Sequence, residues 1–295
     1  MGRPLLALLL ILQPGLAGAQ PLQDDLRRQF TARLEAVADR LDGVAGYAVV
    51  DLTTGTTVAA RHASEPFPTA SAIKVAILYE LLRRADEGAL ALDAVRPLDR
   101  SQVVGGSGVL RHLTAPALSL RDHAALMMIV SDNTSTNVLI EAVGMSNVTA
   151  RMQALGLPDV LLRRRMMDDA AVRRGDENVA SPASLLKATE LLWRGEGLSA
   201  ASRDLGREIM RQVPGPIRAA VPSPVAVFSK TGSLDGVRAE TAIVDLPGAP
   251  FGLAVMTTYL DDAAAGTRAI AEIAGASYSY FDRLASSGKY GRRVP

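Results

Sequence analysis

The chain contains the segment Pro68-Thr69-Ala70-Ser71-Ala72-Ile73-Lys74, which continues into the apolar run Val75 to Leu82. Read as a helix, it places Ser71 and Lys74 on one face with Cβ atoms roughly 5–6 Å apart. A serine hydroxyl attacks well only when a base takes its proton, and a lysine amine can be that base only while neutral. Burial and a second cation must lower the lysine pKa by roughly 3 units to allow this. The spacing indicates such a pair, or else a helix start with a solvated lysine one turn on.

The N-terminal residues, 1–19, have the pattern of a secretory signal peptide. A short apolar run, Leu5 to Leu12, precedes the small residues Ala17-Gly18-Ala19. We therefore expect cleavage near Ala19 and a secreted or periplasmic product. The apolar run is too short to cross a bilayer, and no second long apolar run follows, so we expect no membrane span.

Composition excludes several classes of function. The chain has no cysteine, which removes disulfides, thiol catalysis and thiolate metal sites. Its 32 basic and 31 acidic residues give a net charge of +1, which favours no nucleic-acid partner. The histidines, His62, His112 and His123, lack metal-site spacing, and His123 lies in an apolar helical run that favours a packed core residue. Gly105 to Val109 lacks the last glycine of a nucleophile elbow. We expect no metal and no other cofactor.

The order of predicted elements indicates an α+β fold. Apolar periodicity predicts helices at 24–42, 75–84, 120–131, 133–143, 147–155, 182–193 and 263–285. Runs rich in β-branched residues predict strands at 44–51, 57–60, 225–230, 237–246 and 251–259. We expect an antiparallel sheet flanked by the terminal helices, with an all-helical lobe inserted. The expected α/β lobe is 20–66 plus 207–288, the helical lobe 67–206 and the tail 289–295. Two lobes form a cleft, where sites usually lie.

Two further short motifs strengthen the first. Ser131-Asp132-Asn133 lies 60 residues after Ser71, and Lys230-Thr231-Gly232 lies 159 residues after it. Ser-x-x-Lys, Ser-Asp-Asn and Lys-Thr-Gly occur together in class A β-lactamases and penicillin-binding proteins, and the sequence resembles this family. The resemblance extends from the hairpin before Phe67 to the strands after Lys230. It implies a β-lactamase/transpeptidase-like fold and opening of a β-lactam ring through an acyl-enzyme.

The resemblance also implies roles for individual residues. Ser71 is the expected nucleophile, Lys74 the base and Ser131 the relay that passes a proton to the departing ring nitrogen. Lys230 is the second cation that lowers the lysine pKa, and with Thr231 it attracts the substrate carboxylate. The implied substrate-binding residues are Asn133, Thr231, Gly232, Ser233 and Arg238.

Backbone N–H groups are needed where negative charge develops on the attacked carbonyl oxygen. The resemblance assigns them to Ser71 and Ser233. Asn133 is expected to hold the substrate amide and to contact the Ser-x-x-Lys lysine. Arg238 is either a second contact for the substrate carboxylate or a solvated edge-strand arginine. Asp132 is interpreted as a structural hydrogen-bonding residue.

The sequence departs from class A β-lactamases at one important position. Those enzymes carry a loop glutamate that activates the water that releases the acyl group. Counting from the motifs on both sides places Met166 or Met167 there, and Ala170 or Ala171 replaces the loop asparagine. Because a positioned general base contributes roughly 10²–10⁴ in rate, we expect ready acylation and slow release.

Two aspartates lie close to the missing glutamate. Asp168 and Asp169 could substitute for it if the loop backbone is shifted, but ion pairs with the arginines 163–165 are the favoured interpretation. Asn137 matches a family position that braces this loop, although an ordinary helix asparagine fits as well.

Three functions therefore remain open. The first is a class A β-lactamase-type hydrolase with slow turnover, and the second is a penicillin-binding D-alanyl-D-alanine carboxypeptidase. The third is a non-catalytic sensor of β-lactams or peptidoglycan that stays acylated. In each case the partner is a β-lactam or a peptidoglycan stem peptide, and we expect a monomer.

Overall fold

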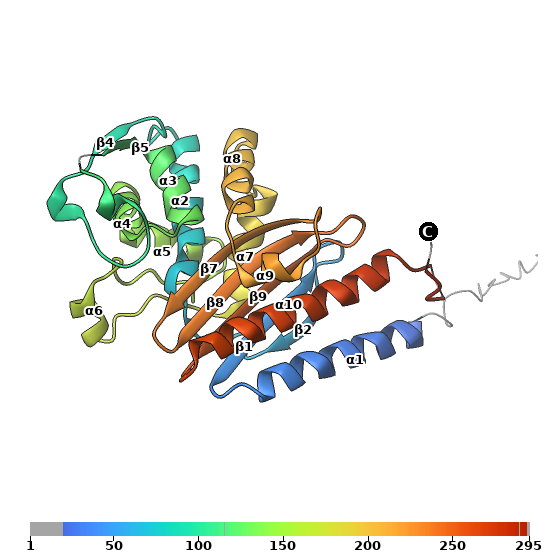
Figure 1. Ribbon diagram of the computed structural model, residues 1–295. Coiled ribbons are helices and arrows are strands. Elements are labelled where there is room, and N and C mark those ends of the chain that lie inside the picture. The colour runs from blue at the N-terminus through green and yellow to red at the C-terminus, as the bar shows by residue number, and fades with distance from the viewer. Residues whose placement is uncertain (1–19, 115, 289, 294–295) are drawn as a thin grey trace, which may run out of the picture.

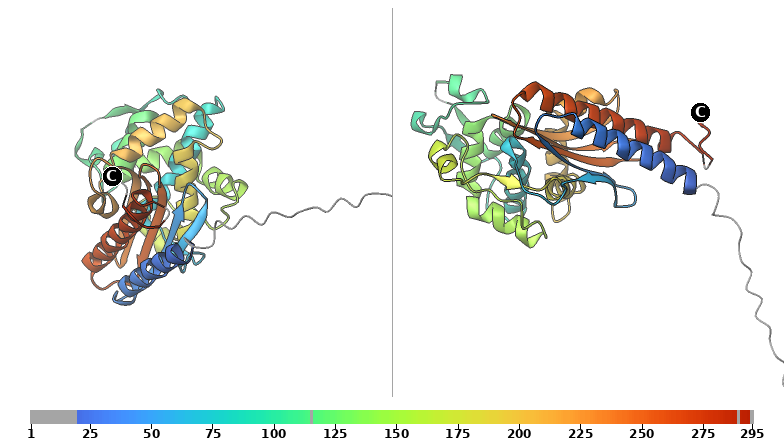
Figure 2. Two further views of the ribbon diagram at one scale, coloured as in Figure 1. Left: turned by 90° about the vertical axis from the view of Figure 1, so that its right-hand side faces the viewer. Right: turned by 90° about the horizontal axis from the view of Figure 1, so that it is seen from below.

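The computed structural model describes residues 20–114, 116–288 and 290–293 (Figure 1). The expected signal peptide, 1–19, lies outside the described residues. Figures 1 and 2 show an α+β fold, in which one antiparallel sheet has two long terminal helices on one face and a helical segment on the other. This confirms the predicted fold class. Within the described part of the chain, no helix combines the length and the apolar character needed to cross a membrane.

The sheet has five strands in the order β2-β1-β9-β8-β7, and each neighbouring pair is antiparallel. Their bounds are β1 Val44–Asp51, β2 Thr56–Arg61, β7 Ala226–Leu234, β8 Val237–Asp245 and β9 Phe251–Thr258. Strand β1 pairs with β9 along its full length, so segments from the two ends of the chain form one sheet, as the sequence predicted. Strand β7 is the edge strand and carries the Lys-Thr-Gly motif.

The terminal helices, α1 (Gln20–Asp39) and α10 (Ala263–Ala285), cover one face of this sheet (Figure 2). They bury a core that also includes alternate residues of the strands. Phe30 stacks on Tyr280 at 4.5 Å between ring centroids, and Phe251 stacks on Phe281 at 4.4 Å. Because strand residues alternate between the two faces, the other half of the strand positions faces the helical segment.

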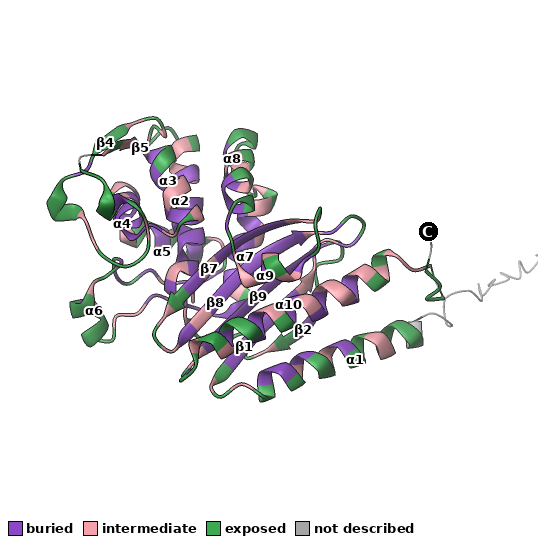
Figure 3. Cartoon of the chain, viewed as in Figure 1, coloured by how far each residue is buried: buried purple, intermediate pink, exposed green. Residues whose placement is uncertain are grey.

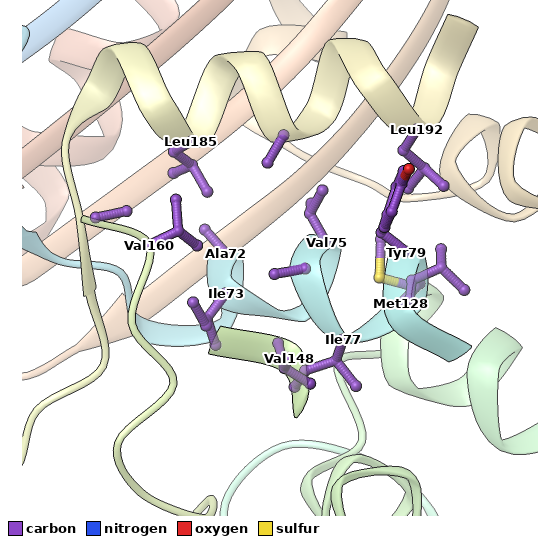
Figure 4. Close-up of a cluster of buried hydrophobic side chains, with 14 of the residues drawn as sticks. Ala72, Ile73, Val75, Ile77, Tyr79, Met128, Val148, Val160, Leu185 and Leu192 are labelled. Carbon is purple, nitrogen blue, oxygen red and sulfur yellow. The ribbon is translucent and has the colours of Figure 1, made fainter. Parts of the chain in front are cut away.

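Most of the segment between β2 and β7 packs on the opposite face, whereas its last short helix, 216–220, contacts α10 and joins the core under the terminal helices. It contains α2 Lys74–Asp86, α3 Leu120–Ile129, α4 Asn133–Val143, α5 Met145–Ala154, α6 Asp169–Arg173, α7 Pro182–Arg194, α8 Ala200–Arg211 and α9 Pro216–Ala220, the 3₁₀ turns Ala70–Ile73, Arg100–Gln102 and Leu110–His112, and the strand pairs β3 Phe67–Pro68 with β6 Val179–Ala180 and β4 Val95–Pro97 with β5 Ala117–Ser119. Helix α2 is its centre: residues 74–82 are all buried (Figure 3). Figure 4 shows Ile77 of α2 beside Val148 of α5, and Leu185 of α7 beside Val160 in the same cluster.

Helices α6, α8 and α9 were not predicted. In α8, Gly206 lowers helix propensity, yet a Cβ there would lie 3.1 Å from Leu192 and 3.3 Å from Leu82. The missing side chain therefore lets α8 pack closely on α2 and α7, and this tertiary packing outweighs the local propensity. Helix α8 runs across positions 206 and 207, where we placed the lobe boundary. We keep the division into two lobes as a proposal. At the other end, Arg293 forms an isolated β-bridge with Ser287.

Candidate active site

Ser71 lies in the 3₁₀ turn that leads into α2. The turn is held from the other side of the site, because the Thr69 N–H and hydroxyl both donate to the Asn178 carbonyl oxygen, at 2.9 and 3.0 Å. Ala70 has φ 48°, a left-handed conformation that costs a non-glycine residue about 1–3 kcal/mol. Ser71 itself is half-buried. The fold therefore presents this serine from a fixed and strained turn.

Lys74 is completely buried one turn after Ser71. Its Nζ donates to the Ser131 carbonyl oxygen at 2.9 Å, to Ser131 Oγ at 3.1 Å and to Asn133 Oδ1 at 3.1 Å. Ser131 has φ 56°, so it occupies a second strained position at the site. The Ser-Asp-Asn and Ser-x-x-Lys motifs thus meet through the lysine amine.

Lys230 approaches the same hydroxyl from strand β7. Its Nζ lies 3.2 Å from Ser131 Oγ and 3.0 Å from the Thr231 carbonyl oxygen, and its side chain is also completely buried. Ser131 Oγ is therefore within hydrogen-bond distance of two lysine amines from different parts of the chain. This geometry unites three motifs that are far apart in the sequence.

Burial of two lysines so close together changes their protonation. Burial, followed by repulsion from Lys230, holds the pKa of Lys74 well below its ordinary value, and Asp132 opposes this effect. Burial also lowers the pKa of Lys230 to about 7, and Glu240 opposes it. The lowered pKa of Lys74 favours its neutral amine, the form that a lysine base requires.

Gly232 lets β7 lie directly against the Ser71 turn. A Cβ on this residue would be only 2.4 Å from the Thr69 carbonyl oxygen and 3.0 Å from the Ala72 nitrogen. Both atoms belong to the backbone and cannot rotate away, so the motif needs glycine here. Ser233, the next residue, is thereby placed beside the turn.

Arg238 lies across from Ser233 in the β7–β8 register. Its Nη1 donates to the carbonyl oxygens of Leu234 and Val237 at 2.9 and 2.7 Å. The guanidinium group is therefore half-buried at the end of this hairpin. The geometry places it beside the strand that carries the Lys-Thr-Gly motif.

Asp132 accepts backbone hydrogen bonds and does not face the serines. Its Oδ2 accepts from Val109 N at 2.6 Å and Leu110 N at 2.9 Å, and its Oδ1 accepts from Ser135 N at 2.8 Å. The residue caps α4 and holds the preceding loop against it, which agrees with the structural interpretation from sequence. His123 is buried too, with Nδ1 3.2 Å from Ser135 Oγ.

The loop after α5 carries methionine where the resemblance led us to expect glutamate. Asn137 brackets the Met166 backbone, donating to its carbonyl oxygen at 3.1 Å and accepting from its N–H at 2.8 Å. Met166 is buried in the hydrophobic core, whereas Met167 has φ 61° and is 48% exposed. The bracing role of Asn137 is therefore seen directly, and it encloses Met166.

Within the described chain, the two loop aspartates form no ion pair with the arginines beside them. Asp168 caps α6, with Oδ1 accepting from Ala171 N at 2.9 Å, and Asp169 is exposed. The predicted ion pairs of these aspartates with the arginines 163–165 are wrong. Arg164 pairs instead with Glu177 at 2.7 Å, and Arg165 approaches Glu141 at 3.8 Å. The reason is tertiary packing. The two aspartates stand at the start of α6, whereas Arg164 faces the end of the loop and Arg165 faces α4.

A groove of about 510 Å³ runs between this loop, α4 and the segment 101–104. Its walls include Val104, Asn137, Met166 and Met167. Asn137 lies one helical turn after Asn133, so the groove starts next to the motif that holds Lys74.

Comparison with known proteins agrees with this geometry. The model of the Beta-lactamase enzyme family matches residues 29–281, most of the chain. The chain belongs to the β-lactamase enzyme family. The family resemblance seen in the sequence motifs is thus confirmed, and the antiparallel sheet with its helices is the fold of this family's solved structures.

Three solved structures are similar to this chain in both sequence and fold. The β-lactamase from Sphaerobacter thermophilus DSM 20745 has 31% sequence identity and a TM-score of 0.80, with 86% of this chain and 97% of that chain covered. PBP-A has 25% identity and a TM-score of 0.79, with 88% and 97% covered. A β-lactamase from Chitinophaga pinensis DSM 2588 has 25% identity and a TM-score of 0.78, with 85% and 98% covered. A PBP-A variant has also been solved as an acyl-enzyme complex with penicillin G.

Sequence reasoning missed two residues that organise the site of this β-lactamase family member. Asn178 ties the loop to the Ser71 turn, because its Oδ1 accepts from Arg163 N at 2.7 Å while its carbonyl oxygen holds Thr69. Glu240 is a fully buried carboxylate in β8. Its signal was an acidic residue in the middle of a β-prone run, where a side chain that is fully buried is seldom charged without a special role.

Proposed function

We propose that the protein is an exported serine hydrolase of the class A β-lactamase type, which opens the β-lactam ring through an acyl-enzyme on Ser71. One observation carries the proposal: Ser131 Oγ lies 3.1 Å from the Lys74 amine and 3.2 Å from the Lys230 amine. The Ser131 hydroxyl is shared by two buried lysines, and one of them, Lys74, lies one turn after Ser71. Such an arrangement can move protons between the two serines. Membership of the β-lactamase family and the predicted signal peptide support it.

The neutral Lys74 amine takes the proton from the Ser71 hydroxyl as its oxygen attacks the ring carbonyl carbon. The carbonyl oxygen becomes negatively charged, and the N–H groups of Ser71 and Ser233 stabilise it. When the C–N bond breaks, its electron pair goes to the ring nitrogen. Ser131 gives that nitrogen a proton and receives one from the Lys74 ammonium, so the lysine returns to its neutral form. The product is an ester of Ser71.

Substrate recognition depends on charge and on one amide. Protonated Lys230 and the Thr231 hydroxyl bind the substrate carboxylate, with Arg238 as a second contact from the end of the hairpin. Asn133, which already contacts Lys74, holds the substrate amide. The adjoining groove receives the rest of the acyl group. We propose that the protein works as a monomer.

Release of the acyl group is slow in this proposal. Met166 occupies the enclosed loop position, Asp168 caps a helix, and Asp169 is exposed. None of these side chains supplies a positioned base, which is worth roughly 10²–10⁴ in rate. The same observation, with the likeness to PBP-A, favours a second candidate, a penicillin-binding D-alanyl-D-alanine carboxypeptidase acting on peptidoglycan stem peptides. A sensor that remains acylated is the third.

One experiment separates these candidates. The mature protein is mixed with a chromogenic cephalosporin, and absorbance and intact mass are followed together. Many turnovers per molecule indicate a β-lactamase, whereas a long-lived adduct on Ser71 indicates a peptidase or sensor. Cleavage of a D-alanyl-D-alanine peptide then separates those two.

The control variant is Ser71→Ala, which keeps the turn but has no hydroxyl. We expect it to form no adduct and to turn over no cephalosporin. An adduct of unchanged yield in this variant contradicts the assignment of the nucleophile. Absence of both adduct and turnover in the unmodified protein, with any β-lactam, contradicts the proposed function.

A further inference from the structure

Glu240 is a carboxylate with no exposure to solvent. It lies in β8 directly opposite Thr231 of the Lys-Thr-Gly motif, and the two side chains share one face of the sheet. Lys230 points to the other face, toward the helical segment. Burying a carboxylate is costly unless other groups compensate its charge, so a glutamate here needs an explanation.

The contacts of Glu240 tie a neighbouring segment to this strand. Its Oε2 accepts a hydrogen bond from Ile217 N at 2.9 Å, whereas Oε1 has no hydrogen-bond partner among the described residues. A Cβ on Gly215 would lie 2.2 Å from Oε1 and 2.8 Å from Thr231 Cγ2. The Gly215 backbone therefore covers both side chains at once. Glu240 holds this segment, 213–217, against Thr231.

The charged groups that act on this carboxylate come from two elements. Lys230 contributes from β7 and Arg218 from α9. The Arg218 guanidinium is engaged by backbone oxygens, donating to Val213 O at 2.9 Å and also to the carbonyl oxygens of Arg211 and Val227. Glu240 forms no ion pair within the described part of the chain. Lys230 directly precedes Thr231, the register partner of Glu240, so the carboxylate lies one strand away from this lysine although the two side chains face opposite sides of the sheet.

The two lysines of the site have different acidic neighbours. Asp132 acts on Lys74, whereas Glu240 is the group that raises the pKa of Lys230 against the effect of burial. Burial raises the pKa of Glu240 to about 7, and the Ile217 N–H, the Ser229 hydroxyl, Lys230 and Arg218, in this order, oppose the effect. Each group thus favours the charged form of the other. Charge compensation for Lys230 therefore comes from the strand next to β7.

We propose that Glu240 is a positioning residue for the carboxylate anchor: it supplies the counter-charge to the Lys230 ammonium and holds the 213–217 segment over Thr231. The inference rests on the proposed role of Lys230 and Thr231 in binding the substrate carboxylate. Glu240 touches no substrate and acts only through these two residues. Its loss weakens recognition of the carboxylate and spares the chemistry at the nucleophile.

The first test measures protonation directly and needs no substrate. The chain has four lysines, Lys74, Lys187, Lys230 and Lys289, so ¹³C-lysine NMR titration of the full protein resolves each Cε signal. In Glu240→Gln, which keeps an oxygen for Ile217 N, we expect the pKa of Lys230 to fall by about one unit, a tenfold change in its protonation. An unchanged pKa overturns the proposal.

Two further variants keep the test decisive. Glu240→Asp retains the charge with a shorter reach, so the pKa of Lys230 should stay near its original value even if the Ile217 contact loosens. A fall equal to that in Glu240→Gln overturns the counter-charge. Asp245→Asn removes an exposed charge from the same strand, where Asp245 lies 3.6 Å from Arg207. It should leave the titration unchanged, and an equal fall there overturns the proposal as well.

The second test compares acylation by a penicillin and by its methyl ester over pH 5.5 to 8.5. The unmodified protein should prefer the free acid below pH 7 and lose the preference as Lys230 deprotonates. In Glu240→Gln the preference should fall about fivefold at pH 7, because the protonated fraction of Lys230 falls from about one half to about one tenth, and the pH at which the preference is lost should shift down by about one unit, while the ester reacts at its original rate. An unaltered pH profile overturns the proposal. If the unmodified protein is not acylated at all, the proposed function fails, and the NMR titration still decides the role of Glu240.

Discussion

Gly232 is the point where strand β7 approaches the backbone of the Ser71 turn most closely. A Cβ atom on this residue would lie 2.4 Å from the Thr69 carbonyl oxygen, a distance that real Cβ contacts essentially never show, and 3.0 Å from the Ala72 nitrogen. No side chain can move aside, because both neighbours are backbone atoms. The variant Gly232→Ala must therefore separate β7 from the turn.

The size of this separation sets the expected effect. The distance to the Thr69 oxygen must increase from 2.4 Å to 3.0 Å or more. The two proposed oxyanion donors, the N–H groups of Ser71 and Ser233, lie on the two parts that move apart. A misplacement of about 1 Å costs roughly 100-fold in rate, and loss of one oxyanion donor costs roughly 10²–10³-fold. We expect acylation of Gly232→Ala to slow by about 100-fold.

The assay is the second-order rate of acylation by a chromogenic cephalosporin, with thermal denaturation to verify folding. The matched control is Gly105→Ala, on the loop whose carbonyl oxygen accepts from Asn133 Nδ2 at 3.2 Å. A Cβ there meets no atom within 4 Å, so acylation should change by no more than about twofold. If Gly232→Ala acylates as fast as the unmodified protein, the close approach of β7 does not control the site.

Three other changes test the lysine base and the loop. Met166→Glu should speed release of the acyl group by roughly 10²–10⁴-fold, measured as decay of the adduct mass. The matched comparison is Met167→Glu at the exposed neighbouring residue, and equal acceleration by both variants would contradict the selection of Met166. Lys74→Arg should lower the acylation rate by roughly 10²–10⁴-fold because arginine keeps its proton, and adduct formation at the original rate would refute the base. Asn137→Ala removes both hydrogen bonds to the Met166 backbone. Urea denaturation should show a free energy of unfolding that is lower by about 1–3 kcal/mol. Unchanged stability would show that the loop does not depend on these two hydrogen bonds.

The lysine pair explains why the site depends on its surroundings as much as on its motifs. Lys74 and Lys230 are both fully buried and both lie near Ser131 Oγ. Two ammonium groups at this separation repel each other strongly in a medium of low dielectric constant, so one lysine must lose its proton. The two nearby carboxylates act on different lysines: Asp132 raises the pKa of Lys74 and Glu240 raises the pKa of Lys230, each against the effect of burial.

The sequence alone predicted the elements that local patterns specify. The helices at 133–143 and 263–285 agree with the structure to the residue, because their apolar spacing and end residues are local signals. The hairpin at 44–60 and the three later strands were found for the same reason. The three short motifs were also enough to identify the family, because each motif lies within three or four consecutive residues and can be read directly from the sequence.

Contacts between distant segments decided the remaining features. Only the fold shows that Asn137 encloses Met166, 29 residues away, and that Lys230 meets Ser131 across 99 residues. The partners of the loop arginines and the depth of Glu240 likewise depend on which elements pack together. Hydrogen bonds, ion pairs and burial act through space and carry no short-range signal along the chain. The sequence therefore determined the family and the reacting groups, whereas the tertiary structure determined how those groups are oriented, buried and charged.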